Sequence, residues 1–166
     1  MERYMLNEEL VVTLPEGFEA MEEDAFEEAF PGHKEDAFAI HDNEKKITIG
    51  IFWNRSGFLY TKLRKPKILG GLKPQFERYY GDYELLSAIE GKVLGNDSDG
   101  LRYEYTKDDV RYCGETIVCN SRKTIYVIYY SAPKETAESA HKLFYGMLKA
   151  FRLSSVEGEF PDGYEE

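Results

Sequence analysis

Residues 85–130 carry the pattern that most constrains the fold: extended segments separated by short polar turns. Apolar and polar residues alternate through 101–106, and after a turn at Lys107-Asp108-Asp109 a further extended segment occupies 110–119. A period of two residues is typical of β-strands, and short turns make neighbouring strands antiparallel. Residues 123–130 are apolar on both sides, which predicts a central strand covered on both faces.

Two further details of this antiparallel meander follow from the residue types. Residues 85–94 are expected to form its first strand, with Gly91 as a candidate β-bulge. The run Asn96-Asp97-Ser98-Asp99-Gly100 consists of residues that favour turns. We therefore expect this run to connect the first strand to the second.

Helices are predicted at three places. Residues 137–151 place apolar side chains on one helical stripe, and Pro133 suits the first turn of this helix. Residues 21–30 show a shorter amphipathic pattern with acidic residues in the first turn, where they complement the helix dipole. A third, short helix is expected from Pro74 onwards, since proline is well tolerated at the start of a helix.

The first half of the chain adds three strands and a long loop. A strand is expected at 10–14, and residues 36–41 and 45–53 form a predicted β-hairpin. Residues 54–71 have weak periodicity, so we expect a long loop there, with room for a short helix. Together these elements predict an α+β fold, in which a central antiparallel β-sheet is flanked by helices on both faces as an α/β/α sandwich.

Charge and length exclude several classes of protein. The 166 residues carry a net charge of −10, which argues against binding to nucleic acids and anionic lipids, and no apolar run approaches the roughly 20 residues of a membrane helix. Residues 1–36 contain 12 acidic and 2 basic residues, whereas residues 37–75 contain 2 and 8. One explanation is that these two parts fold against each other. We expect one domain at 1–155 and an acidic tail at 156–166.

The sequence contains no recognisable catalytic or metal-binding set. Cys113 and Cys119 fall in a predicted strand, without the basic setting at a helix start that activates a thiol, and we expect both to be reduced. Glu138 and His141 share one helical face, but a di-iron site needs this spacing twice, so a solvated helix flank explains them better. We therefore expect a non-enzymatic protein without a cofactor or metal ion.

The segment from Trp53 to Lys67 is the candidate binding site. It combines aromatic and basic residues in a predicted irregular loop, and aromatic residues and arginine are enriched at protein interfaces. The alternative is that the segment covers the sheet and neutralises the acidic N-terminal part. The candidate residues are Trp53, Arg55, Phe58, Tyr60, Lys62, Arg64, Lys65 and Lys67.

Five short segments carry a family resemblance: Leu14-Pro15-Glu16-Gly17-Phe18, Ile89-Glu90-Gly91, Tyr103-Glu104-Tyr105, Ile125-Tyr126-Val127-Ile128-Tyr129 and Phe151-Arg152-Leu153. Their order resembles the PsbP-like superfamily, which includes the Mog-type Ran-binding proteins and bacterial DcrB-like proteins. The resemblance runs from about Asn7 to Ser154. It implies a central antiparallel sheet with helices on both faces, and a binding or accessory role without catalysis. No shared functional motif matches, so the resemblance implies no site residue.

These observations lead to one functional hypothesis and two alternatives. We expect a non-enzymatic binding or adaptor domain for a protein partner. The first alternative is an enzyme or binder of a small acidic or phosphorylated ligand at the basic residues 55–73; the second is a self-associating structural domain. The opening residues contain no signal peptide, so we expect a cytoplasmic location, or an extracytoplasmic one if a leader has been removed.

Overall fold

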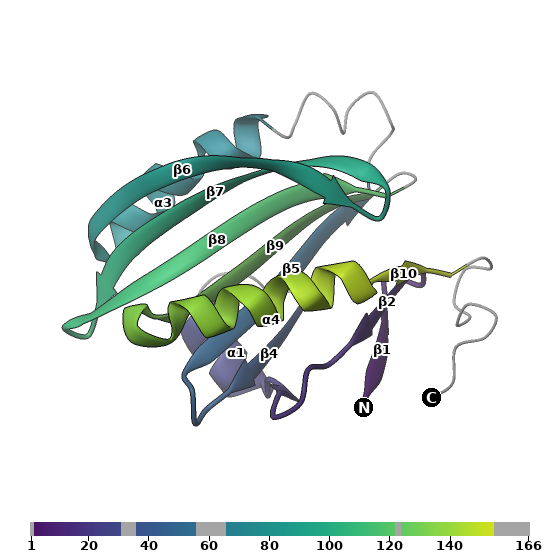
Figure 1. Ribbon diagram of the computed structural model, residues 1–166, viewed down its shortest axis with the longest axis horizontal. Coiled ribbons are helices and arrows are strands. Elements are labelled where there is room, and N and C mark those ends of the chain that lie inside the picture. The colour runs from purple at the N-terminus through teal and green to yellow at the C-terminus, as the bar shows by residue number, and fades with distance from the viewer. Residues whose placement is uncertain (1, 31–35, 56–65, 122–123, 155–166) are drawn as a thin grey trace.

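The computed structural model describes residues 2–30, 36–55, 66–121 and 124–154. Within these residues, a seven-stranded antiparallel sheet has the order β3-β4-β5-β9-β8-β7-β6, and a smaller sheet has the order β1-β2-β10 (Figure 1). The elements are β1 (Arg3–Leu6), β2 (Leu10–Thr13), β3 (Glu19–Ala20), α1 (Glu23–Ala29), β4 (Ala37–Asp42), β5 (Ile47–Arg55), α3 (Leu72–Tyr79), β6 (Gly81–Val93), β7 (Asn96–Lys107), β8 (Val110–Asn120), β9 (Thr124–Pro133), η1 (Lys134–Thr136), α4 (Ala137–Ala150) and β10 (Arg152–Leu153).

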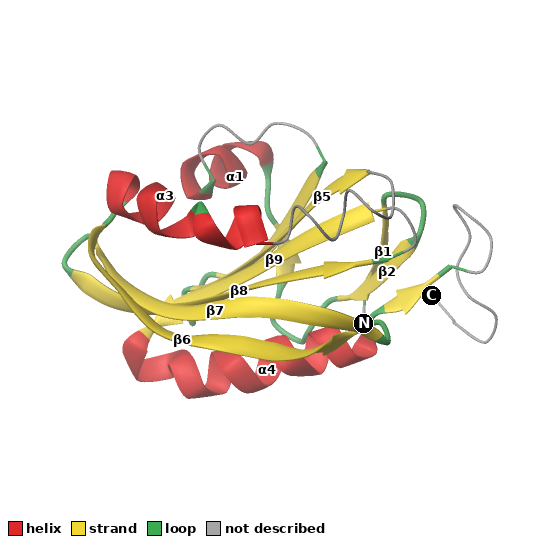
Figure 2. Cartoon of the chain, turned by 90° about the horizontal axis from the view of Figure 1, so that it is seen from above, coloured by secondary structure: helices red, strands yellow, loops and turns green. Residues whose placement is uncertain are grey.

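Helices cover both faces of the large sheet. The helices α1 and α3 lie on one face and α4 lies on the other (Figure 2). Residues 66–70, within the predicted long loop, are also helical. The α+β sandwich that the sequence predicts is therefore confirmed.

The strand β9 is the central strand that its apolar residues predict. It lies between β5 and β8, and Tyr126, Ile128 and Tyr130 on one side belong to the main hydrophobic core. On the other side, the ring of Tyr129 packs edge-on against Phe52, with ring centroids 5.3 Å apart. Because successive side chains of a strand point to opposite faces, this one segment contributes to both layers of the core.

The helix α4 closes the main core with its apolar stripe. Ala140, Phe144, Met147 and Leu148 are buried, and the ring of Phe144 lies 4.7 Å from that of Tyr130. Pro133, predicted in the first turn of this helix, is instead the last residue of β9, and a 3-10 turn separates it from α4. Proline is tolerated at a strand end because its missing N–H interrupts no further ladder pair.

The connection between β6 and β7 differs from the prediction. A two-residue turn at Leu94-Gly95, with φ angles of 55° and 77°, joins Val93 to its partner Asn96. The predicted turn at residues 96–100 is therefore wrong, because a tight hairpin needs only two residues with positive φ and the polar run then continues the strand. The bulge predicted at Gly91 is also wrong: Gly91 pairs regularly with Ser98.

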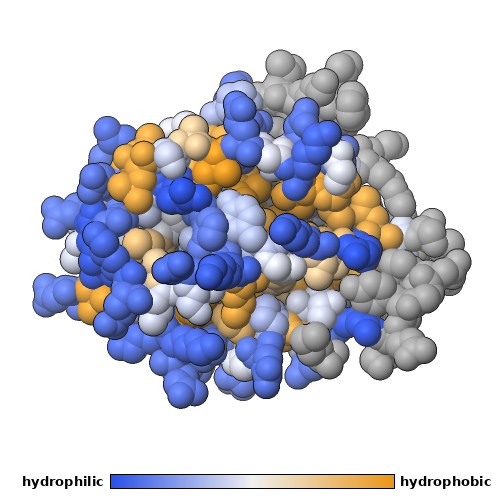
Figure 3. All heavy atoms as spheres, viewed as in Figure 1, coloured by the Kyte–Doolittle hydropathy of each residue, from blue (hydrophilic) through white to orange (hydrophobic). Residues whose placement is uncertain are grey.

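The register of β6 shifts at its other end, between Gly81 and Glu84 and between Leu85 and Ser87. This strand forms one edge of the large sheet, and Leu85 is 53% exposed and Leu86 44% exposed. Figure 3 shows apolar residues along the upper part of the molecule, over β6, on an otherwise largely hydrophilic face. An irregular edge strand pairs poorly with strands of other chains. The register shifts therefore protect this exposed apolar edge from aggregation.

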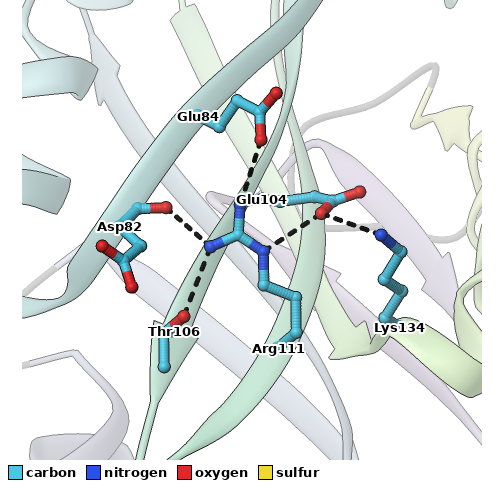
Figure 4. Close-up of polar contacts among 6 residues, drawn as sticks. All are labelled: Asp82, Glu84, Glu104, Thr106, Arg111 and Lys134. Atoms are coloured by element: carbon cyan, nitrogen blue, oxygen red, sulfur yellow. Dashed lines mark hydrogen bonds and ion pairs between the residues drawn. The ribbon is translucent and has the colours of Figure 1, made fainter.

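Arg111 holds this irregular end of β6 to its neighbours (Figure 4). Its guanidinium donates to the backbone oxygen of Asp82 at 2.6 Å and to Glu84 at 3.3 Å, both on β6. It also donates to Glu104 on β7 at 3.1 Å, and the ammonium of Lys134 contacts the same Glu104 oxygen at 3.3 Å. One arginine of β8 thus fixes β6 across the width of β7.

We expect Asp109→Gly to raise the free energy of unfolding by about 0.5–1 kcal/mol. Asp108 and Asp109 form the turn between β7 and β8 with φ angles of 50° and 62°, a conformation that glycine adopts without steric cost. Thermal unfolding of both proteins tests this. The control Asp99→Gly makes the same charge change inside β7, and there the glycine should lower stability.

Candidate functional site

A cavity of about 430 Å³ lies between α1, α3 and the large sheet. This volume falls in the range of roughly 300–1,000 Å³ that is typical of small-molecule sites. Met21, Ala25 and Ala29 line it on the side of α1, and Gln75 on the side of α3. Its aromatic lining includes Phe30, Phe76, Tyr79, Tyr80, Tyr103, Tyr105, Tyr112 and Tyr129.

The strand period explains why tyrosines gather in this cavity. Tyr103 and Tyr105 are two residues apart on β7, so they share the face that α3 covers. Tyr105 is directly opposite Tyr112 on β8, and their rings stack with centroids 5.8 Å apart. The alternating sequence of three neighbouring strands therefore places their tyrosines on one surface.

The cavity separates two groups of aromatic rings. In the group under α3, Phe76 lies 4.5 Å from Tyr103, and Tyr80 lies 4.7 Å from Tyr105, between ring centroids. In the group under α1, the ring of Phe30 lies 6.3 Å from that of Tyr129. Members of both groups line the cavity, so a bound molecule would meet aromatic rings from two sides.

Burial keeps the hydroxyls of four cavity tyrosines protonated at physiological pH. Burial raises the pKa of Tyr129 to about 12 and also raises the pKa of Tyr103 and Tyr80. Burial raises the pKa of Tyr105 as well, although a hydrogen bond from Ser131 opposes this. These side chains can donate or accept hydrogen bonds, but as neutral phenols they are poor bases.

Charged side chains of both signs also line the cavity. Glu28 and Asp42 contribute carboxylates, and Lys46 and Lys107 contribute ammonium groups. The carboxylate of Asp42 is buried and accepts hydrogen bonds from the next turn, including one from the backbone N–H of Glu44 at 3.0 Å. Of the two acids, Glu28 is the exposed one and can meet a ligand.

A second polar cluster lies on the opposite face of the sheet, under α4. The carboxylate of Glu115 on β8 is fully buried and contacts Arg102 at 3.0 Å, Tyr145 at 3.0 Å and the Nδ1 of His141 at 2.7 Å. His141 thus pairs with Glu115 rather than forming a site with Glu138, which is exposed. Because the cluster joins α4 to β7 and β8, it explains how the helix is positioned.

The predicted binding segment is only partly described. Trp53 is half-buried and packs against the main core, Lys67 is exposed at the start of the helical residues 66–70, and Arg55 donates to Asn7 at 2.9 Å. The other candidates lie outside the described residues: Phe58, Tyr60, Lys62, Arg64 and Lys65. The protein interface at this segment therefore stays a prediction.

Other predictions about side chains can be compared with the structure. Cys113 and Cys119 both lie on β8, and neither is joined in a disulfide bond within the described residues. Among the described residues, no group of histidine, cysteine and acidic side chains has a geometry that could hold a metal ion. None of the helices in the described part of the chain has the length and apolar run needed to cross a membrane.

Comparisons with known proteins identify the fold. No protein-family model and no curated protein sequence matches the chain. Cyanobacterial PsbP from Synechocystis aligns over 92% of both chains with a TM-score of 0.65 and 12% identity. LpqN of Mycobacterium tuberculosis, a protein involved in cell envelope biogenesis, aligns over 87% of this chain and 83% of its own, with a TM-score of 0.56 and 12% identity.

A protein from Bacteroides thetaiotaomicron also shares this architecture. It aligns over 95% of this chain and 49% of its own length, with a TM-score of 0.63 and 12% identity. The fold is therefore PsbP-like, which confirms the fold that the resemblance implied. Similarity at this level of identity identifies the fold alone, and the function has to be argued from the site.

Proposed function

We propose that this protein is a non-catalytic binding domain whose ligand occupies the cavity between α1 and α3. The observation that carries the proposal is the cavity itself: about 430 Å³ lined by aromatic rings from α3, β7, β8 and β9. Apolar and aromatic walls with a few polar groups are typical of ligand sites. The protonated tyrosines support binding over catalysis, because none of them is poised to act as a base.

We expect the wild type to gain thermal stability from compounds that fill this cavity. A ligand at about 100 times its Kd stabilises the native state by about 2.7 kcal/mol, and this shifts the Tm of a domain of this size by about 5–10 °C. A thermal-shift screen of small apolar and aromatic compounds measures this effect. Ala25→Phe should abolish it, because the new ring projects from the α1 side into the cavity that Ala25 lines.

A matched control separates occupation of the cavity from a general effect of the added ring. Ala137→Phe places the same ring at a half-buried position of α4, on the other side of the sheet, and should leave the ligand-induced shift intact. If no compound stabilises the wild type, or if Ala25→Phe responds to every compound as the wild type does, the proposed site is wrong.

A further inference from the structure

We infer that the cavity binds the cationic group of an organic molecule, a quaternary ammonium or a protonated amine attached to an apolar body. This inference rests on the proposed function, since it names the class of ligand for the same cavity. It follows from two independent features of the structure: the aromatic lining and the charge of the α1 wall.

The aromatic lining suits a cation. A ring attracts an ammonium group that lies over its face within about 6 Å of the centroid, and cages of several aromatic side chains recognise quaternary ammonium ligands in this way. Tyr80, Tyr105 and Tyr112 line the cavity on one side, and Phe30 and Tyr129 line it on the other. A compact cation between these walls would have several rings within reach while its alkyl groups stay in contact with apolar surface.

The protonation of the tyrosines supports the same conclusion. Because burial raises the pKa of Tyr129 to about 12, and raises that of Tyr80 and Tyr105 too, these rings remain neutral phenols at physiological pH. They attract a cation through their ring electrons.

The helix α1 is acidic and places one carboxylate, that of Glu28, in the cavity lining. This helix carries Glu23, Asp24, Glu27 and Glu28 and has no basic residue, and the whole chain has a net charge of −10. Of these four acids, Glu28 lines the cavity, and its carboxylate attracts a cation there. On the side of α1, a cation is therefore favoured by Glu28 as well as by the rings.

Lys46 and Lys107 also line the cavity, and they make the sign of the ligand testable. If the ligand is a cation, these ammonium groups repel it and their removal strengthens binding. If the ligand is an anion, the same lysines attract it and their removal weakens binding. A cationic ligand and an anionic ligand therefore predict opposite effects of the same lysine substitution on affinity.

Three probes of the same shape test the inference in the full-length protein by titration calorimetry. They are choline, its neutral isostere dimethylbutanol, in which carbon replaces nitrogen, and the matching carboxylate dimethylbutanoate. We expect choline to bind about tenfold more tightly than dimethylbutanol, and dimethylbutanoate to bind more weakly than either. Added salt should weaken the effects of the exposed charges more than the attraction by the rings, which acts inside the cavity.

Variants then assign the effect to named residues. Tyr80→Leu keeps an apolar side chain but removes the ring and should abolish the preference for choline, whereas Tyr80→Phe keeps the ring and should retain it. Lys107→Ala should increase the affinity for choline about two- to fivefold, and Glu28→Gln should decrease it by a similar factor. Lys107 and Glu28 are at least partly exposed, so the variants at these two positions should fold as the wild type does.

The outcomes distinguish this inference from the proposed function on which it rests. Equal binding of choline and dimethylbutanol, or tighter binding of dimethylbutanoate with a loss in Lys107→Ala, would overturn the cationic ligand while leaving the cavity as a binding site. If none of the three probes binds and the apolar compounds also fail to stabilise the protein, the proposed function fails together with the inference.

Discussion

Gly114→Ala is expected to lower the free energy of unfolding by about 3 kcal/mol. A Cβ atom at this position of β8 would lie 2.7 Å from the ring of Tyr103 and 2.9 Å from the backbone oxygen of Tyr130. Neither neighbour can move away at low cost. Tyr103 is fully buried and its hydroxyl is hydrogen-bonded to Thr116 at 2.6 Å, while the oxygen belongs to the ladder between β8 and β9.

The measurement is urea denaturation of the variant beside Gly146→Ala. Gly146 is an exposed residue inside α4, and a Cβ there would meet no atom within 4 Å. The control should therefore gain about 0.5–1 kcal/mol, since alanine suits a helix better than glycine. Wild-type stability in Gly114→Ala would mean that Tyr103 does not lie across this glycine. The position of Tyr103 in the cavity lining would then be wrong.

The strands were predictable because every second side chain of a strand packs into the same layer of the core, which leaves an alternating pattern in the sequence. Ile47, Ile49 and Ile51 alternate in the sequence, and all three are buried in the core under α4. The turn at Leu94-Gly95 was not predictable in the same way. Leucine rarely adopts a positive φ, and the polar run that follows it contains more residues that favour turns, so residue preference pointed to the wrong place.

The cavity could not be predicted from the sequence, because its walls come from segments far apart in the chain. Tyr105 and Tyr129 fit the strand pattern, and a tyrosine in a strand is usually a packing residue. What leaves space is the small side chains that α1 presents to them, Ala25 and Ala29. The sequence offers one hint of a cavity: large residues on the strands and alanines on a short helix. This hint can be used only once the strands and the helix are known to pack against each other.

Glu115 was missed for a related reason. Its segment was recognised as a strand, but a single carboxylate inside it says nothing about burial until its partners are known. Arg102 is directly opposite Glu115 on β7, and His141 and Tyr145 are one helical turn apart on α4, facing the same carboxylate. An acidic residue at an inward position of a strand predicts such partners, because an unpaired buried charge is very costly.

Glu115→Ala is expected to lower the free energy of unfolding by about 3 kcal/mol. The substitution removes a fully buried carboxylate to which Arg102, His141 and Tyr145 are bound, and breaking a buried ion pair from one side costs about 3–5 kcal/mol. The lower end applies here, because the side chains of Arg102 and His141 are 42% and 39% exposed and can be partly hydrated. Urea denaturation at pH 7 measures the loss.

The same carboxylate should make the protein sensitive to acid. Burial by itself raises the pKa of Glu115, but hydrogen bonds from Tyr130, His141 and Arg102 outweigh it, so the pKa lies below the ordinary value of 4.5. The ionised form is therefore favoured in the native state, and its contribution to stability is present above about pH 4.5 and is lost as the pH falls through the lower, native pKa.

Glu115→Gln should accordingly show a shallower fall in stability between pH 5 and pH 3 than the wild type, measured by urea denaturation at each pH. Part of the fall should persist in this variant. The pKa of Glu104 is also lowered, since hydrogen bonds from Arg111 and Lys134 outweigh the effect of its burial. Glu104→Gln should remove that second part, and the double variant should have the flattest profile. A full acid response in Glu115→Gln would show that the native fold does not hold this carboxylate in its ionised form, and the anchoring of α4 would need another explanation.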